Sequence, residues 1–443
     1  MVAFGRSPFD REIIALAVPA LGALAADPLV SLIDTAFVGR LGTTELASLS
    51  VAVAVFGVFF AVFNFLAYGT TPLLGRALGN SDGAGAGRIA GSAMAMAVGL
   101  GVVFAVLMAG FAEPLLRLLG SGADLIEPAG GYLRIRSLAL PAVLIVLVGN
   151  GVFRGAQDTR TPLGITIGLN VVNLILDPIL IFGLDMGLNG AAWATVVAQW
   201  VGAGWFALEL RRSAGHMGIA WQRPSIATVR ELARTGGVLV LRTAGLLMAL
   251  TAATSVAARI GDSDVAAHQI GVQLFFFLAL TLDAIAVAAM AMLGRTTGEV
   301  ETTGEVSLLY RQADRLVVMG LYAGVGLAAA LTVLSGILPR WFTSERDVLA
   351  NVSQIYPQLV LLQVVGGLVF AWDGIVIGVT AFVHAMLATV IPSIITTAVL
   401  VVIAVEGGQL GDVWWALVLL LVLRATYLAW WHVTRLGRGL VAV

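Results

Sequence analysis

The sequence contains no cysteine and no lysine, and each absence excludes a class of chemistry. Without cysteine the chain can form no disulfide, no thiolate nucleophile and no iron–sulfur site. Without lysine it has neither the P-loop lysine of a nucleotide-driven pump nor a Schiff-base lysine. All 25 basic residues are therefore arginine, and the formal net charge of −1 gives no reason to expect nucleic acid as a partner.

Charged residues are scarce as well, at 12% of the chain, whereas 59% of the residues are apolar. A soluble domain carries roughly 25% charged residues. The apolar residues lie in blocks of about 20, which is the length that crosses roughly 30 Å of hydrocarbon as a helix. The first block is followed by further spans and lacks a cleavage signal, so we interpret it as a span and not as a signal peptide. The composition predicts an all-α integral membrane protein.

Twelve transmembrane helices are predicted, near residues 13–37, 46–72, 88–110, 130–153, 161–183, 187–209, 233–258, 265–292, 316–337, 355–378, 382–404 and 413–433. If the N-terminus is cytoplasmic, sixteen arginines fall in cytoplasmic segments and seven in outer segments. Arginine is enriched in cytoplasmic loops of membrane proteins. The sequence therefore predicts a multi-pass protein of the cell (inner or plasma) membrane with both termini cytoplasmic.

The two halves of the chain repeat each other at a constant offset. Arg40-Leu-Gly42 matches Arg259-Ile-Gly261, and Leu74-Gly-Arg76 matches Leu293-Gly-Arg295 at the same offset. Later the offset grows by four positions, and two glycine pairs with small-xxx-small spacing correspond, Gly151 and Gly155 with Gly374 and Gly378.

This repeat predicts the domain organisation. Six spans return the chain to the same side of the membrane, so the halves are parallel repeats related by an axis along the membrane normal. We expect an N-lobe at 1–215, a cytoplasmic inter-lobe loop at 216–232 and a C-lobe at 233–443. The expected architecture is two six-helix bundles around a central cleft.

Ionisable side chains inside the spans are the first candidates for function, because each costs ~2.5–3.5 kcal/mol at the bilayer centre. The carboxylates are Asp27, Asp34, Asp177, Asp283 and Asp373, and the guanidiniums are Arg242 and Arg424. The four histidines are widely spaced and form no zinc pattern, so no metal site of that kind is expected.

Two of these helices carry polar faces. Asp27 and Asp34 are two turns apart on one face, and Asn170, Asn173 and Asp177 follow one another along a second helix. Carboxylates gathered in such a place can hold a proton, because desolvation and like charge both favour the neutral acid. They can equally coordinate a hard cation such as Na⁺. The pattern indicates ion coupling without selecting the ion.

Several of these groups also have a structural interpretation. Asp27 precedes Pro28 and could lie near the interface at a kink, and Asp373 could serve helix packing through the adjacent glycine. Asp283 corresponds to Asn64 in the repeat, so both halves have a polar residue at this position, which favours a structural role. Arg242 and Arg424 are expected to neutralise a carboxylate or to extend to the interface.

Four motifs resemble the multidrug and toxic compound extrusion (MATE) family, in its branch named for the DNA-damage-inducible protein F (DinF). They are Leu32-Ile-Asp-Thr-Ala-Phe-Val-Gly39, Asn170-Val-Val-Asn-Leu-Ile-Leu-Asp177, Gly190-Ala-Ala-Trp-Ala-Thr195 and Trp372-Asp-Gly-Ile-Val-Ile-Gly378. The first and second motifs together carry most of the specificity. The similarity extends over essentially the whole chain and includes Arg242 and Arg424.

The resemblance implies an ion-coupling site in the N-lobe. In it Asp34 is the carboxylate whose protonation is linked to bending of the first span near Pro19, with Pro28 as a second hinge. The residues that complete the site by the same resemblance are Asn173, Asp177, Thr195 and Tyr132. The ligands of a Na⁺ ion would be Asp34, Asn173, Asp177 and Thr195. The chain departs from some relatives at Val30, where an aromatic hydroxyl can occur. It also lacks the carboxylate that the Na⁺-driven NorM-like branch has in the seventh span, and this favours protons over Na⁺.

The expected function is therefore cation-coupled efflux antiport of small organic cationic or amphipathic substrates, by alternating access and without an enzymatic activity or an organic cofactor. Ion coupling is expected in the N-lobe, because Ala253 stands where the repeat would place a second Asp34. The substrate cavity is expected to be lined by Asn170, Asp283, Asp373, Gln269, Gln273 and Arg242. A monomer in contact with membrane lipid is expected.

Two alternatives come from other classes. A lipid-linked oligosaccharide flippase shares the two-lobe architecture but needs several cations to hold a diphosphate, and only Arg242 and Arg424 qualify here. A polytopic membrane enzyme could use paired carboxylates for acid–base work, but no nucleophile or metal motif accompanies them.

Overall fold

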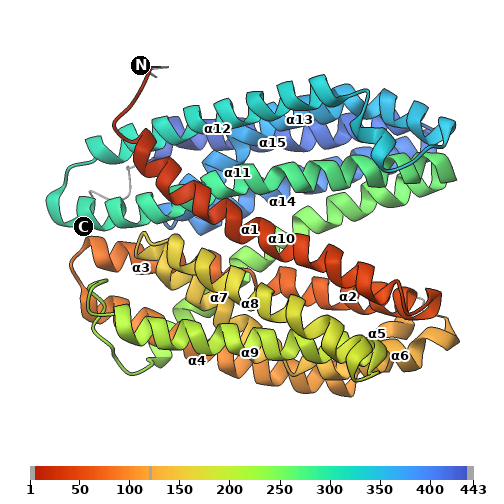
Figure 1. Ribbon diagram of the computed structural model, residues 1–443. Coiled ribbons are helices and arrows are strands. Elements are labelled where there is room, and N and C mark those ends of the chain that lie inside the picture. Colours follow the sequence, from red (N-terminus) through yellow and green to blue (C-terminus); the bar gives the residue numbers. More distant parts are fainter. Residues whose placement is uncertain (1–4, 119–121, 437–443) are drawn as a thin grey trace. The chain divides into compact units, whose positions relative to one another are not determined.

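The computed structural model describes residues 5–118 and 122–436, and in these residues it contains helices and no strand. Figure 1 shows how they follow one another. The elements in chain order are α1 (Asp10–Val38), α2 (Thr43–Phe63), α3 (Phe65–Gly79), α4 (Gly83–Gly110), α5 (Ala112–Leu118), α6 (Ala123–Ser137), α7 (Leu140–Gly155), α8 (Arg160–Pro178), η1 (Ile179–Gly183), α9 (Gly187–Ser213), α10 (Ile226–Ile260), α11 (Asp262–Thr303), α12 (Ser307–Leu334), η2 (Leu338–Trp341), α13 (Arg346–Gly378), α14 (Phe382–Glu406) and α15 (Leu410–Arg435).

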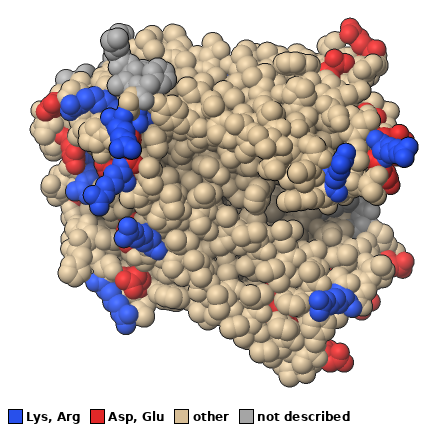
Figure 2. Space-filling model, turned by 45° about the horizontal axis from the view of Figure 1, so that its top comes forward, with Lys and Arg blue, Asp and Glu red and all other residues tan. Residues whose placement is uncertain are grey.

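The helices have the length and composition of membrane spans. Within the described residues, 11 spans are long and apolar enough to cross a bilayer, with α2 and α3 counted together and α8 with η1. The pair α6 and α7, bent by 50°, makes 12 if it is one span. On the face drawn in Figure 2, most charged side chains gather toward the ends of the helices. The predicted all-α membrane fold is confirmed.

The chain divides into two compact units. The N-terminal unit is Val18–Gly236, and the C-terminal unit comprises the described residues of 1–17 and 237–443. Both boundaries lie inside helices, since α1 changes unit at Val18 and α10 at Gly237.

The loop predicted at 216–232 is shorter than expected, because α10 already begins at Ile226. In its first turns Leu232 is buried, whereas Arg230 and Glu231 are exposed. These residues form an amphipathic extension of the span, which a search for continuous apolar runs misses.

The helix boundaries reproduce the repeat. Thr43 begins α2 and Asp262 begins α11, at the first offset of the sequence repeat, and each helix follows a glycine. Ala123 begins α6 and Arg346 begins α13, at the second, longer offset. The left-handed residues that follow α7 and α13, Gln157 and Thr380, are related by this second offset as well.

The glycine pairs allow close helix–helix contact in both units. In the N-terminal unit a Cβ at Gly151 would lie 3.1 Å from Ala67 O, so α7 approaches α3 backbone to backbone. In the C-terminal unit a Cβ at Gly374 would lie 2.6 Å from Ala286 Cα, so α13 approaches α11 in the same way. Ala286 is the equivalent of Ala67 in the repeat. The small-xxx-small interpretation of both pairs is confirmed.

The units differ in the continuity of these helices. The span α6–α7 breaks at residues 138–139, and Pro141 occupies the first turn of α7, where its missing N–H costs nothing. The equivalent position in the unbroken α13 is Val364. Likewise Asn64 separates α2 from α3, whereas its equivalent Asp283 lies within the continuous α11.

An ion pair and a hydrogen bond bring the start of α1 and the end of α15 to one end of the C-terminal unit. Arg315 Nη2 donates to Asp10 Oδ2 at 2.7 Å, and His432 Nε2 lies 2.9 Å from Asp314 Oδ1. Because Asp314 and Arg315 are adjacent on α12, both ends of the described chain lie on the same side. This arrangement agrees with an even number of spans.

Candidate functional site

The polar faces predicted on the first and fifth spans meet in the N-terminal unit. Asp34 comes from α1, and Asn173 and Asp177 come from α8. Asp177 and Asn173 are both buried, and Asn173 Nδ2 lies 3.5 Å from Asp177 Oδ1, at the limit of a hydrogen bond. The carboxyl groups of Asp34 and Asp177 lie within hydrogen-bonding reach of each other.

This carboxyl pair has a specific chemical property. Asp34 Oδ1 and Asp177 Oδ2 are buried oxygens to which no described group donates a hydrogen bond. Ionised carboxylates only accept hydrogen bonds, so two of them cannot satisfy each other. A single proton converts one group into a donor and joins the pair. The pair can therefore hold one proton, and its oxygens suit a small cation equally well.

A second contact joins the same two helices. Asn170 Nδ2 donates to Asp27 Oδ1 at 2.9 Å. Asp27 precedes Asp34 by seven residues, and Asn170 precedes Asp177 by the same number, so the two contacts are two helical turns apart on both helices. Asp27 itself is exposed on the surface of the unit, whereas Asn170 is buried.

Arg136 is a member of this site that the sequence analysis missed. It lies close enough to Asp34 and Asp177 for a direct charge interaction, and its side chain bonds to the buried hydroxyl of Tyr132. Its Cζ lies 4.5 Å from the ring centroid of Phe56, a cation–π contact. Arg136 follows Tyr132 by one helical turn, and this i,i+4 spacing was the signal available in the sequence.

The other predicted members of the site have the following places. Tyr132 is 5% exposed and lies near both carboxylates. Thr195 is buried, but its hydroxyl donates to Ala191 O of its own helix at 3.0 Å, so it does not donate to the carboxyl pair. Pro19 and Pro28 both lie inside α1, and Pro19 follows the boundary between the two units by one residue.

The polar centre of the C-terminal unit is an ion triad. Arg242 Nη2 of α10 donates to Asp373 Oδ2 of α13 at 2.7 Å, and Arg424 Nη2 of α15 donates to the same oxygen. Asp373 and Arg424 are buried, and the Arg242 side chain is 19% exposed. Both arginines therefore pair with the carboxylate of Asp373, as expected for residues that neutralise a buried charge.

Three of the other predicted cavity residues are more exposed to solvent than Asp373 and Arg424 of this triad. Gln269 and Gln273 of α11 are exposed, and Asp283 is half-buried. Gln363 of α13, which the sequence analysis did not select, is fully buried, and neither of its amide atoms has a hydrogen-bond partner among the described residues.

The charges of the two polar centres differ. Around the carboxyl pair of the N-terminal unit, the three carboxylates Asp27, Asp34 and Asp177 all interact with the guanidinium of Arg136. In the C-terminal unit the carboxylates Asp283 and Asp373 stand against Arg242 and Arg424. Of these two polar centres, the one around the carboxyl pair therefore has the excess of negative charge. In the part of the chain that the structure describes, no three His, Asp or Glu side chains gather as a metal site.

Comparisons with known proteins find one family over most of the chain. The family model described as MatE matches residues 19–179 and 240–403. Protein DETOXIFICATION 44, chloroplastic, of Arabidopsis thaliana is 33% identical over 451 residues, which cover 98% of this chain and 84% of that protein. The DNA damage-inducible protein F of Escherichia coli (strain K12) is 29% identical over 388 residues, which cover 84% of this chain and 81% of that protein.

The fold also matches solved structures. A crystal structure described as MATE in the bent conformation superimposes with a TM-score of 0.89, covering 98% of this chain and 96% of that one. Its sequence identity is 21%, so this likeness concerns the fold.

Proposed function

The chain belongs to the MatE family of membrane transporters, and from this premise we propose that it exports small organic cations in exchange for protons by alternating access. The observation that carries the proposal is the carboxyl pair of Asp34 and Asp177, whose buried oxygens lack a donor unless one of the two groups holds a proton.

The proposed exchange follows from competition at this pair. When both carboxyl groups are ionised, the site attracts a cationic substrate, since Asp27, Asp34 and Asp177 outnumber the neighbouring guanidinium of Arg136. Protonation removes one of these charges and joins Asp34 to Asp177, which weakens the hold on the substrate. Proton and substrate then weaken each other by the same coupling free energy, as antiport requires.

The C-terminal unit has a different proposed role. Asp373 is held by two arginines, so it offers no free charge to a cation. We assign ion coupling to the N-terminal unit, and assign to the C-terminal unit a neutral polar surface for substrate, to which the exposed Gln269 and Gln273 belong.

The flippase alternative receives less support from the same contacts. A diphosphate needs several available cations, whereas Arg242 and Arg424 both contact Asp373. We further propose that the protein is a monomer of the cell membrane with both termini in the cytoplasm.

Transport by purified protein in liposomes tests the proposal. A pH gradient should drive uptake of organic cations from a panel, and a Na⁺ gradient at equal pH should not. Asp34→Asn mimics the protonated state, so it should abolish pH-driven transport and weaken substrate binding while the protein still folds.

The matched control is Asp185→Asn. Asp185 is exposed and has a left-handed backbone (φ 53°) that asparagine also tolerates, so transport should be unchanged. Wild-type transport by the Asp34→Asn protein under a proton gradient would refute the coupling role, and transport driven by Na⁺ alone would identify the other ion.

A further inference from the structure

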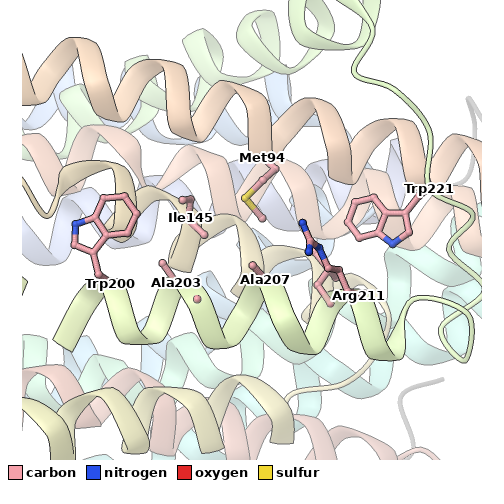
Figure 3. A pocket seen from close by; sticks show the side chains of 9 residues that line it. Met94, Ile145, Trp200, Ala203, Ala207, Arg211 and Trp221 are labelled. Atoms are coloured by element: carbon pink, nitrogen blue, oxygen red, sulfur yellow. The ribbon is translucent and has the colours of Figure 1, made fainter. Parts of the chain in front are cut away.

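A groove lies on the N-terminal unit, away from the carboxyl pair. It has a volume of about 510 Å³ and is lined by residues of α4, α7 and α9 and of the segment that follows α9. Figure 3 shows Trp200 at one end and Arg211 with Trp221 at the other, with Met94, Ile145, Ala203 and Ala207 between them. Its lining is apolar except at the end that carries Arg211.

The small residues of α9 create the groove. A Cβ at Gly204 would meet no atom within 4 Å, so the space beside it is open. Gly204 and Ala207 are both exposed, and Ala203 continues the same row of small side chains. An open apolar groove on a membrane helix is filled by hydrocarbon, since water gains no hydrogen bonds there.

The length of the groove matches one leaflet of a bilayer. Trp200 and Arg211 are eleven residues apart on α9, which corresponds to about 16 Å along a helix. Half of a hydrocarbon core of about 30 Å is about 15 Å. A groove of this length takes one acyl chain, from the middle of the bilayer to the interface.

Both ends of the groove are held in place. Trp200 Nε1 donates to Leu138 O at 3.1 Å, and that carbonyl lies at the break between α6 and α7. A carbonyl at a helix break in the membrane requires such a donor. The ring therefore closes the inner end of the groove in a defined position.

The segment after α9, which carries Trp221 at the Arg211 end of the groove, is fixed on α4. Ala220 N donates to Gly83 O at 2.9 Å, and Ser225 N donates to Ser92 Oγ at 3.1 Å. A Cβ at Gly91 would lie 3.0 Å from Gln222 O, so the segment lies directly on the glycine face of α4. This contact sets the position of Trp221, which is 45% exposed and of the type that lies at membrane interfaces.

The end of the groove that carries Arg211 is positively charged. Residues 211–223 contain Arg211, Arg212 and Arg223 and no acidic residue. Within the described residues none of these arginines forms an ion pair. The C-terminus of α9 favours cations in general, but only Arg211 of the three lines the groove.

We propose that this groove binds one anionic phospholipid, with an acyl chain along Ala203, Gly204 and Ala207 and the phosphate on Arg211. The hydrocarbon chain covers the open side of α9, and Trp221 packs beside the glycerol region. Guanidinium and phosphate form charge-assisted hydrogen bonds, which adds a preference for anionic headgroups. This site is separate from ion coupling, because none of its residues belongs to the carboxyl pair.

Native mass spectrometry of the purified, delipidated full chain tests the proposal. The protein is titrated with phosphatidylglycerol and with phosphatidylcholine of the same acyl chains. The wild type should bind one phosphatidylglycerol more tightly than phosphatidylcholine by about fivefold, which corresponds to about 1 kcal/mol for one arginine near a charged surface.

Two variants address the two parts of the site. Arg211→Gln should abolish the preference for phosphatidylglycerol, and Gly204→Leu should displace the bound lipid of either type. The matched controls are Arg212→Gln, which removes the adjacent arginine outside the groove, and Gly99→Leu, at an exposed glycine of α4 with no atom within 4 Å of a Cβ. Both controls should bind as the wild type does. Equal effects of Arg211→Gln and Arg212→Gln, or retention of the lipid by Gly204→Leu, would overturn the proposal.

Discussion

At the residue scale, the ion triad of the C-terminal unit shows how partners decide the role of a buried charge. Asp373 alone would be an acidic group in a membrane helix and a site for cations. With Arg242 and Arg424 on one of its oxygens it becomes the link that joins α10, α13 and α15. Its contribution is therefore to stability first.

The triad leads to a stability prediction. Asp373→Asn leaves Arg424 buried without its counter-charge, and loss of one partner of a buried ion pair costs about 3–5 kcal/mol. The melting temperature of the detergent-solubilised protein, followed by tryptophan fluorescence, should fall clearly. The double variant with Arg424→Met should recover part of the loss, because the buried charge is then gone and Arg242 is partly exposed. An Asp373→Asn protein as stable as the wild type would contradict this account.

The carboxyl pair shows how much of a site residue spacing can predict. Asp34, Asn173 and Asp177 were recognisable because polar residues recur on one face of each helix, and this periodicity is a local property. For Arg136 the spacing shows only that it shares a face of α6 with Tyr132, since its contact with the pair depends on the rotation of α6 about its axis. That rotation is set by packing against other helices.

At the element scale, close backbone approach through glycine is the device shared by both units. Gly374 brings α13 onto α11, and Gly151 brings α7 onto α3. In lipid, helices associate through van der Waals contact more than through hydrophobic burial, so such small-residue contacts matter greatly.

This packing leads to a prediction for helix association. Gly374→Ala places a Cβ 2.6 Å from Ala286 Cα, and because that neighbour is backbone it must shift. Overpacking of this kind costs about 1–3 kcal/mol, so the melting temperature should fall. Gly326→Ala in α12 is the control, since its Cβ meets nothing within 4 Å and its melting temperature should stay or rise slightly. Equal stability of the two variants would show that α13 and α11 adapt without cost.

At the scale of the whole molecule, α1 is the element that belongs to both units. Its first turns group with the C-terminal unit, where Arg315 holds Asp10, and from Val18 it belongs to the N-terminal unit with Asp34. Figure 1 shows α1 as one unbroken helix. Pro19 directly follows the change of unit and removes one backbone hydrogen bond there.

The position of Pro19 predicts where α1 bends during transport. Pro19→Ala restores the missing hydrogen bond, stiffens the helix at the unit boundary and should slow pH-driven transport several-fold. Binding of the substrate should be unchanged, because no residue of the carboxyl pair is altered. Pro28→Ala is the comparison and should have the smaller effect, since it lies well beyond the boundary. The reverse order in transport measured with liposomes would assign the hinge to Pro28.

The sequence by itself determined the membrane class, the positions of the spans, the repeat and the carboxylate-bearing faces of α1 and α8. Each of these follows from a one-dimensional property: the length of an apolar run, a constant offset or the period of a helix. The residues around Arg230 were taken for loop for the same reason, since an amphipathic helix end interrupts the apolar run without ending the helix.

The tertiary structure decided which charges meet. Asp373 accepts hydrogen bonds from Arg242, 131 residues away in the sequence, and from Arg424, 51 residues away. Asp34 lies close to Asp177 and Arg136, which belong to two other helices. The breaks at Asn64 and before Pro141, and the groove beside Gly204, likewise arise only when helices pack. The physical reason is that a helix fixes the direction of its side chains relative to its own axis, whereas their partners depend on how neighbouring helices rotate and pack against it.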